Sequence, residues 1–304
     1  MLLFALINGI LCHDDSTKGN EVLIARYAVI PLTKTVGLIK WVTGADTMHQ
    51  MIVENRKMYG ISKEIESEVI ISFTSTSFVS MNTLQRLEVF EEVLTKTKGQ
   101  ELFEAMWLKS PSAAVWMTRT QRFTLSSSLM SMVGYIIGLG DRHPSNIMVQ
   151  RETGNIVHID FCESFEKTLF RKQFPECVPF RLTRMIINAL EGSIENGLFQ
   201  EFANDIMKIL RDNKETLIAQ LTIFVEEPLS HFQKEGGGEK PVDLIRRCAR
   251  KLDGTESSSF FDKIRDSFKG RKEIPVNEQV STLIDIAADP ANYIKHYPGW
   301  CPFW

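Results

Sequence analysis

The sequence predicts an α+β fold in which a few short strands accompany a mostly helical chain. Two N-terminal runs, residues 22–32 and 37–42, are rich in β-forming residues and read as strands. A third region folds back on itself as a hairpin, with strands at 147–150 and 156–159 and a turn at 153–155. Most of the remaining sequence has the apolar spacing of amphipathic helices.

The composition is that of an ordinary soluble globular protein. Of its 304 residues, 43% are hydrophobic and 24% are charged, which suits one extended core or two domains. A net charge of -3 gives no general attraction to nucleic acid, so we expect no nucleic-acid partner. Five cysteines without C-x-x-C spacing favour a reducing compartment and argue against a disulfide framework or a zinc site.

Helices account for most of the chain by periodicity. The apolar opening lacks the basic residues and the cleavage site of a signal peptide, so we do not expect secretion. Residues 125–137 are apolar around most of the helix circumference but too few to span a bilayer, which predicts a buried helix. Further helices are expected at 51–59, 61–73, 83–94, 185–190, 198–211, 215–225, 242–252, 260–268 and 280–287.

The stretch GLGDRHPSNIMVQRETGNIVHIDF, residues 138–161, carries the candidate site. With residue 153 as its pivot, the hairpin would pair residue 147 with 159 and place Asn146 beside Asp160. A carboxylate and an amide oxygen at one point suit Mg²⁺, which takes its other ligands from water and substrate phosphates. Three polar groups then converge, because Asp141 precedes Asn146 with the D-x-x-x-x-N spacing that protein kinases use.

Taken alone, this spacing also arises by chance, and Asn and Asp often flank turns. The neighbouring Gly138-Leu139-Gly140, His143-Pro144 and Asp160-Phe161 make the pattern specific. With them, the stretch resembles the phosphatidylinositol-3-kinase-related protein kinases, most closely the target of rapamycin (TOR) branch. Segments that extend the resemblance in the same order are YAVIPL at 27–32, WLKSPS at 107–112, MSMVGY at 130–135, FPECVPFRLTRMI at 174–186 and WCPFW at 300–304.

The resemblance implies a protein-kinase-like fold with three parts. Residues 1–47 would be part of the N-lobe and the hinge, residues 48–271 the C-lobe, and residues 272–304 a FATC domain. It also implies a serine/threonine kinase of growth and nutrient signalling that transfers the γ-phosphate of ATP to protein substrates.

Each candidate site residue then has an implied role. Asp141 would orient the acceptor hydroxyl or accept its proton, and His143 would donate to an oxygen of the transition state. Asn146 and Asp160 would hold Mg²⁺. The adenine of ATP would stack on Trp41, which would otherwise be read as a core tryptophan, and would bond to the backbone at Val42. The slot would be closed by Ile39, Tyr27, Thr47, Met148 and Ile159.

Partners follow from position in the same family. Residues 61–98 correspond to the insert that binds a β-propeller subunit, LST-eight, with a solvated helical hairpin as the alternative. The aromatic tip formed by Trp300, Phe303 and Trp304 is expected to plug into the kinase lobe with some membrane contact. The protein would be cytoplasmic with some association with endomembranes.

Two departures from the family pattern bear on activity. Cys162 stands where kinases have the glycine of D-F-G, and its Cβ restricts the backbone. No stretch matches the glycine-rich phosphate loop, the strand lysine and its glutamate partner, so we expect the isolated chain, like a fragment of a longer kinase, to transfer phosphate poorly or not at all. Two alternatives stay open: a phosphatidylinositol kinase, which shares GDRH-x-x-N and D-F, and a non-catalytic binding module.

Overall fold

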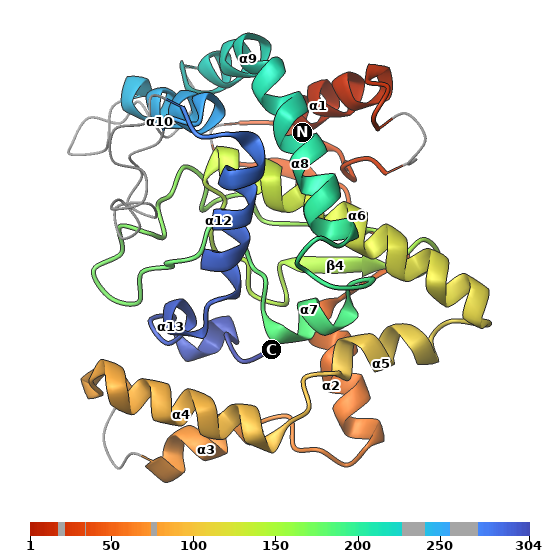
Figure 1. Cartoon of the computed structure of the whole chain (residues 1–304), viewed down its shortest axis with the longest axis vertical. Helices are drawn as coiled ribbons and strands as arrows, with labels where there is room; N and C mark the ends of the chain where they lie inside the picture. Colours follow the sequence, from red (N-terminus) through yellow and green to blue (C-terminus); the bar gives the residue numbers. More distant parts are fainter. Residues whose placement is uncertain (18–21, 34, 74–77, 227–240, 256–272) are drawn as a thin grey trace.

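A computed structural model describes residues 1–17, 22–33, 35–73, 78–226, 241–255 and 273–304 (Figure 1). Helices dominate it and two small sheets complete it, so the predicted α+β class is confirmed. The helices are α1 Leu2–His13, α2 Met48–Met58, α3 Ile65–Phe73, α4 Thr83–Lys96, α5 Glu101–Leu108, α6 Ala113–Ile137, α7 Arg184–Ala189, α8 Leu198–Asp212, α9 Lys214–Glu226, α10 Pro241–Asp253, α12 Val276–Ala288 and α13 Pro290–Tyr293, with 3-10 turns at Phe78–Ser80 and Pro298–Trp300. The strands are β1 Val29–Pro31, β2 Gly37–Ile39, β3 Ala45–Thr47, β4 Ile147–Gln150 and β5 Ile156–His158.

The central hairpin forms, with a register that differs by one residue from the predicted one. Ile147 lies opposite His158, not opposite residue 159. The difference arises because the loop has four residues, 151–154, closed by a hydrogen bond from the Gly154 amide to the Gln150 carbonyl. Gly154 has a φ of 80° and lies so close to helix α6 that a Cβ would sit 2.4 Å from the Arg119 carbonyl oxygen.

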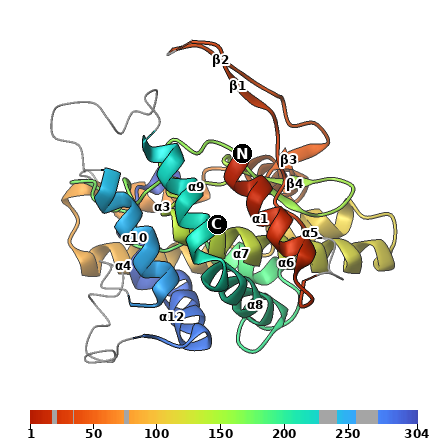
Figure 2. The same ribbon diagram turned by 90° about the horizontal axis from the view of Figure 1, so that it is seen from above.

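The N-terminal strands are shorter than predicted. Residues 22–28 are not in a strand, and only β1 and β2 pair, as a ribbon that stands away from the body (Figure 2). At the end of the part expected as N-lobe and hinge, residues 1–47, strand β3 forms and pairs with β4. The three residues of β3 include only one apolar residue and so show no alternating pattern. The strand forms because it pairs with β4, a tertiary contact that local sequence does not predict.

Helix α6 is the buried axis of the helical part. It is longer than the predicted 125–137, because residues 113–122 mix apolar and polar side chains on a partly exposed stretch that lacks the continuous apolar character of the rest. Ser112 caps its start by accepting a hydrogen bond from the Val115 amide, and Gly138 ends it in the left-handed conformation. Helix α8 packs against it and α12 packs against α8. Among the described residues, none of the helices is long and apolar enough to cross a membrane.

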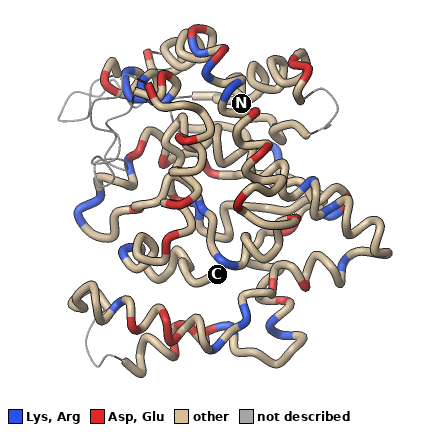
Figure 3. Tube along the Cα trace, in the orientation of Figure 1, with Lys and Arg blue, Asp and Glu red and all other residues tan. Residues whose placement is uncertain are grey.

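The other predicted helices have mixed outcomes. Those near 51–59, 61–73, 83–94, 185–190, 198–211, 215–225, 242–252 and 280–287 form with shifted ends. Helix α5 was not predicted, and the helix expected at 260–268 lies outside the described residues. Lys and Arg are interspersed with Asp and Glu along the trace (Figure 3).

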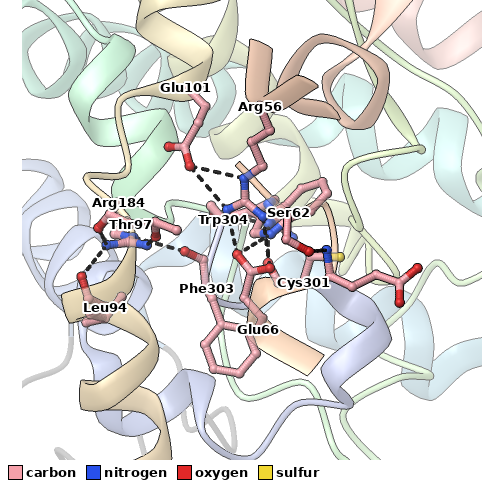
Figure 4. Close-up of polar contacts among 12 residues, drawn as sticks. Arg56, Ser62, Glu66, Leu94, Thr97, Glu101, Arg184, Cys301, Phe303 and Trp304 are labelled. Carbon is pink, nitrogen blue, oxygen red and sulfur yellow. Dashed lines mark hydrogen bonds and ion pairs between the residues drawn. The ribbon is translucent and has the colours of Figure 1, made fainter. Parts of the chain in front are cut away.

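The C-terminal tail is a buried plug. Trp300, Phe303 and Trp304 are only 5%, 3% and 5% exposed. The Trp304 indole donates a 2.8 Å hydrogen bond to Glu66, while Arg56 lies over the Trp304 ring and pairs with Glu66 (Figure 4). The plug expectation therefore holds. The expected membrane contact has to be corrected, because these three rings are turned into the protein and offer almost no apolar surface to a bilayer.

Acid should weaken this plug through His296, which is buried and packs against Trp300 with ring centroids 4.6 Å apart and ring planes tilted by 45°. Burial lowers the pKa of His296 to about 3, below the ordinary value near 6.5. The stability given by the neutral ring is therefore complete above pH 6.5 and is lost as the pH falls toward 3, at about 1.4 kcal/mol per pH unit.

His296→Phe should remove this part of the pH dependence. Urea unfolding between pH 7 and pH 4 is expected to show a shallower loss of stability in His296→Phe than in the unchanged chain. His13→Phe, at an exposed position, is the matched control. An unchanged slope in His296→Phe would contradict the assignment.

Candidate active site

The loop between α6 and β4 carries most of the predicted site, and a buried arginine organises it. The Arg142 guanidinium donates to the carbonyl oxygens of Gly140 (2.8 Å), Ile159 (2.7 Å) and Asp160. These bonds tie the loop to the end of β5. Burial lowers the pKa of Arg142 to about 10, so it stays charged at neutral pH. The sequence reasoning gave Arg142 no role.

Asp141 and Asp160 both take the left-handed backbone conformation, with φ values of 59° and 57°. Such conformations are uncommon outside glycine and gather at functional sites. The Asp141 backbone is held on both sides, since its amide donates to Glu176 Oε2 at 2.8 Å and its carbonyl accepts from Asn146 Nδ2 at 2.8 Å. The backbone thus fixes where the half-buried Asp141 carboxylate lies.

The donor set fits Mg²⁺. The Asn146 amide nitrogen is engaged by Asp141, which leaves the amide oxygen as its metal-binding atom. Asp160 offers an exposed carboxylate, one oxygen of which accepts a 3.1 Å bond from the Cys162 amide. The described residues contain no cluster of three or more His, Cys, Asp or Glu able to cage a metal. A magnesium ion that draws its other ligands from water and phosphates needs no such cage.

His143 is arranged as a neutral donor. Its Nδ1 accepts a 3.2 Å hydrogen bond from the Ser145 amide, so Nε2 carries the proton. Burial lowers the pKa of His143, while the charge of Asp141 opposes that effect. The ring is therefore uncharged at neutral pH and its Nε2–H is free to donate, while its role toward the transition state stays a prediction.

Glu176, like Arg142, is a residue of the site that sequence reasoning missed. It is buried, burial raises its pKa, and it holds the Asp141 amide across 35 positions of sequence. A second oxygen of Glu176 lies 3.4 Å from Arg171. Glu176 lies within the FPECVPF stretch that carries the family resemblance, but no local sequence pattern predicts its contact with Asp141.

The predicted adenine slot is partly assembled. Met148 lies in β4 between Thr47 and Val157, and Tyr27 lies close enough to Arg142 and Asp160 for their charges to act on its pKa, which burial raises. The Thr47 hydroxyl caps α2 by accepting from the Gln50 amide.

The hinge side of the slot is open. Ile39 at the end of β2 and Trp41 just after the ribbon are 71% and 82% exposed, and Val42 is half-buried. A core role for Trp41 is therefore wrong. Its role in adenine stacking, like the roles of Val42 and Ile159, stays a prediction.

Two family models match the chain, phosphatidylinositol 3- and 4-kinase over residues 1–234 and the FATC domain over residues 273–304. The chain belongs to the phosphatidylinositol 3- and 4-kinase family. The "Target of rapamycin homolog" of Caenorhabditis elegans is 39% identical over 329 residues, which cover 100% of this chain and 12% of the relative. "Serine/threonine-protein kinase TOR2" of Saccharomyces cerevisiae is 37% identical over 336 residues, covering 100% and 14%.

The solved structures agree on the fold. The "FAT and kinase domain of CtTel1" superposes with a TM-score of 0.77 at 24% identity, covering 99% of this chain and 20% of that one. The protein-kinase-like fold and the resemblance to TOR kinases are thus confirmed. The chain spans only 12% and 14% of the length of the two curated relatives named above.

Within this kinase fold, Cys162 does not disturb Asp160, the predicted Mg²⁺ ligand. The left-handed residue is Asp160 and not Cys162, so the missing glycine carries no backbone demand here. Cys162 is exposed and its amide supports the Asp160 carboxylate. The neighbouring Phe161 packs edge-on against Phe4 of α1, with ring centroids 5.2 Å apart. Helix α1 therefore contacts the segment that carries Asp160.

Proposed function

We propose that this chain is the catalytic lobe of a TOR-type serine/threonine protein kinase, which transfers the γ-phosphate of ATP to hydroxyl groups of protein substrates. The observation that carries the proposal is the convergence of Asp141, Asn146 and Asp160 through main-chain bonds made by Arg142 and Glu176. Identities of 37% and 39% to proteins named as TOR kinases support it.

Each residue has a defined task in this mechanism. The Asp141 carboxylate orients the acceptor hydroxyl and takes its proton as the oxygen attacks. The Nε2–H of His143 donates to a phosphate oxygen on which charge develops. Asn146 and Asp160 would hold Mg²⁺, which neutralises phosphate charge when bound. Arg142 and Glu176 keep these groups in place, and such positioning supplies most of the rate in phosphoryl transfer.

A propeller subunit of the LST-eight kind is a further part of the proposal. Helices α3 and α4 form a hairpin at one end of the molecule (Figure 1), with Ile71, Phe73 and Leu84 exposed. Exposed apolar side chains on a projecting hairpin suit a protein partner. We also place the protein in the cytoplasm, where its five free cysteines would stay reduced.

A chimera that places this chain within a complete relative tests the proposed function. Residues 1–304, all of which align with Saccharomyces cerevisiae TOR2, would replace the matching region of that protein. Labelled phosphate from ATP is expected to enter a Ser/Thr protein substrate and not phosphatidylinositol vesicles. Labelling of lipid alone would instead support the lipid kinase. No labelling in either, while unaltered TOR2 is active, would support the binding module.

A further inference from the structure

The segment that follows Asp160 is docked on the end of helix α6 through main-chain hydrogen bonds. The Gly140 amide donates to the Glu163 carbonyl at 2.7 Å. The Phe165 amide donates to the Ile137 carbonyl and the Glu166 amide to the Gly138 carbonyl, both at 2.8 Å. Three main-chain bonds therefore join residues 137–140, which lead into the catalytic loop, to residues 163–166, which lead away from Asp160.

The docked segment explains why positions 138 and 140 of the Gly138-Leu139-Gly140 motif are glycines. A Cβ at position 138 would lie 2.6 Å from the Glu166 amide nitrogen, and one at position 140 would lie 2.1 Å from the Thr168 hydroxyl. Gly138 also has a φ of 59°. Side chains at either position would push the segment away. In this structure the motif supports the segment after Asp160.

Helix α10 holds the same segment from the other side through buried charges. The Glu166 carboxylate lies 2.7 Å from Lys251 Nζ and 3.1 Å from Arg247 Nε. Lys251 is 2% exposed and also donates to the Tyr135 carbonyl of α6 at 2.7 Å. Arg247 donates to the Phe165 carbonyl at 3.1 Å. Helix α10 thus binds both α6 and the docked segment.

The two residues that α10 contacts, Phe165 and Glu166, have an unusual backbone conformation. Phe165 and Glu166 are both left-handed, with φ values of 63° and 61°, and both are buried. Successive left-handed residues outside glycine persist only where the surroundings hold them. A buried carboxylate also needs its partners, because an unpaired buried charge is strongly disfavoured. Lys251 and Arg247 meet both needs.

We propose that α10 acts as a clamp, in which Lys251 and Arg247 are positioning residues that fix the backbone from Asp160 to Thr168. They reach the metal-binding end of the site through Glu166 and the docked segment. Neither residue belongs to the catalytic set, so their effect on rate would pass through the position of Asp160. That effect on rate rests on the proposed kinase function, whereas the clamp itself does not.

Hydrogen exchange of the 304-residue chain tests the clamp without any activity. Lys251→Met is expected to speed amide exchange at residues 163–168 by about tenfold or more, because Glu166 loses its closest partner. Arg246→Met removes a charge from the exposed face of the same helix, where Arg246 pairs with Asp243, and should leave exchange unchanged. Unchanged exchange at 163–168 in Lys251→Met, or acceleration spread evenly over α6 and α8, would overturn the proposal.

A double variant separates the clamp from general stability. Glu166→Gln with Lys251→Met removes both buried charges and should melt closer to the unchanged chain than Lys251→Met does. Exchange at 163–168 is nevertheless expected to stay fast, because the charged grip is gone. Return of slow exchange in this double variant would mean that packing and not the ion pair holds the segment, which would refute the clamp.

Kinetics in the TOR2 chimera then measure the consequence for phosphate transfer. Lys251→Met should lower kcat about tenfold with little change in the KM for the protein substrate, whereas Arg246→Met should leave both unchanged. A normal kcat together with fast exchange at 163–168 would show that the clamp does not position the site for phosphate transfer. A chimera without any kinase activity would refute the proposed function and leave the exchange result standing.

Discussion

Asp160→Asn is expected to reduce phosphate transfer by the TOR2 chimera about 10³-fold or more, because it removes the carboxylate that would hold Mg²⁺. The substitution should leave the fold intact. Asp160 is exposed, and its side-chain oxygen accepts a hydrogen bond from the Cys162 amide, which an asparagine oxygen can accept equally well. Asparagine also tolerates the left-handed backbone at this position. Transfer rates at saturating ATP, with Asp212→Asn at an exposed site as the matched control, measure the effect.

Asp141→Asn is the companion variant and should fail at a different step. The backbone bonds to Glu176 and Asn146 remain, so the loop is expected to keep its shape. Loss of the base should lower kcat about 10²- to 10⁴-fold while nucleotide binding persists. Wild-type transfer in Asp141→Asn would remove it from the mechanism.

Arg181→Met should have the largest effect on stability, on the order of 3–5 kcal/mol. The buried Arg181 guanidinium donates to the main-chain oxygens of Trp300 (2.9 Å), Cys301 (2.6 Å) and Trp304 (3.2 Å). It also donates to the Arg142 carbonyl at 3.3 Å, which links the tail to the catalytic loop. A methionine would fill the space and leave these four main-chain oxygens without this donor.

Chemical unfolding of the 304-residue chain measures this prediction. Arg250→Met, at an exposed position, removes an equal charge and should stay within about 0.5 kcal/mol of the unchanged chain. If Arg181→Met is no less stable than that control, the tail is not anchored as described here.

The sequence was most informative where chemistry and short spacing coincide. Asp141, Asn146 and Asp160 were placed at one end of the hairpin from the D-x-x-x-x-N spacing and strand pairing alone. The register was wrong by one residue, since Gly154 packs against Arg119 of α6 and such a tertiary contact has no local signature. Asn146 and Asp160 still share that end, because Arg142 binds the main chain on both sides.

The residues that hold the site were not predictable from local patterns. Glu176 reaches Asp141 and Arg181 reaches the tail over 35 and about 120 positions of sequence. Polar side chains of this kind form hydrogen bonds with backbone atoms that are distant in sequence, and hydrophobic periodicity does not predict such bonds. Periodicity did find most helices, but it missed α5, which is only eight residues long, and the three-residue strand β3.

Calorimetric titration of the 304-residue chain with ATP, with and without Mg²⁺, tests the central claim most directly. We expect Mg²⁺-dependent binding that is lost in Asp160→Asn and retained in Asp141→Asn and in Asp212→Asn. This pattern would place the metal at Asp160 and the proton acceptor at Asp141. Binding that ignores Mg²⁺, or that survives in Asp160→Asn as well as in the control, would contradict the phosphotransfer site described here.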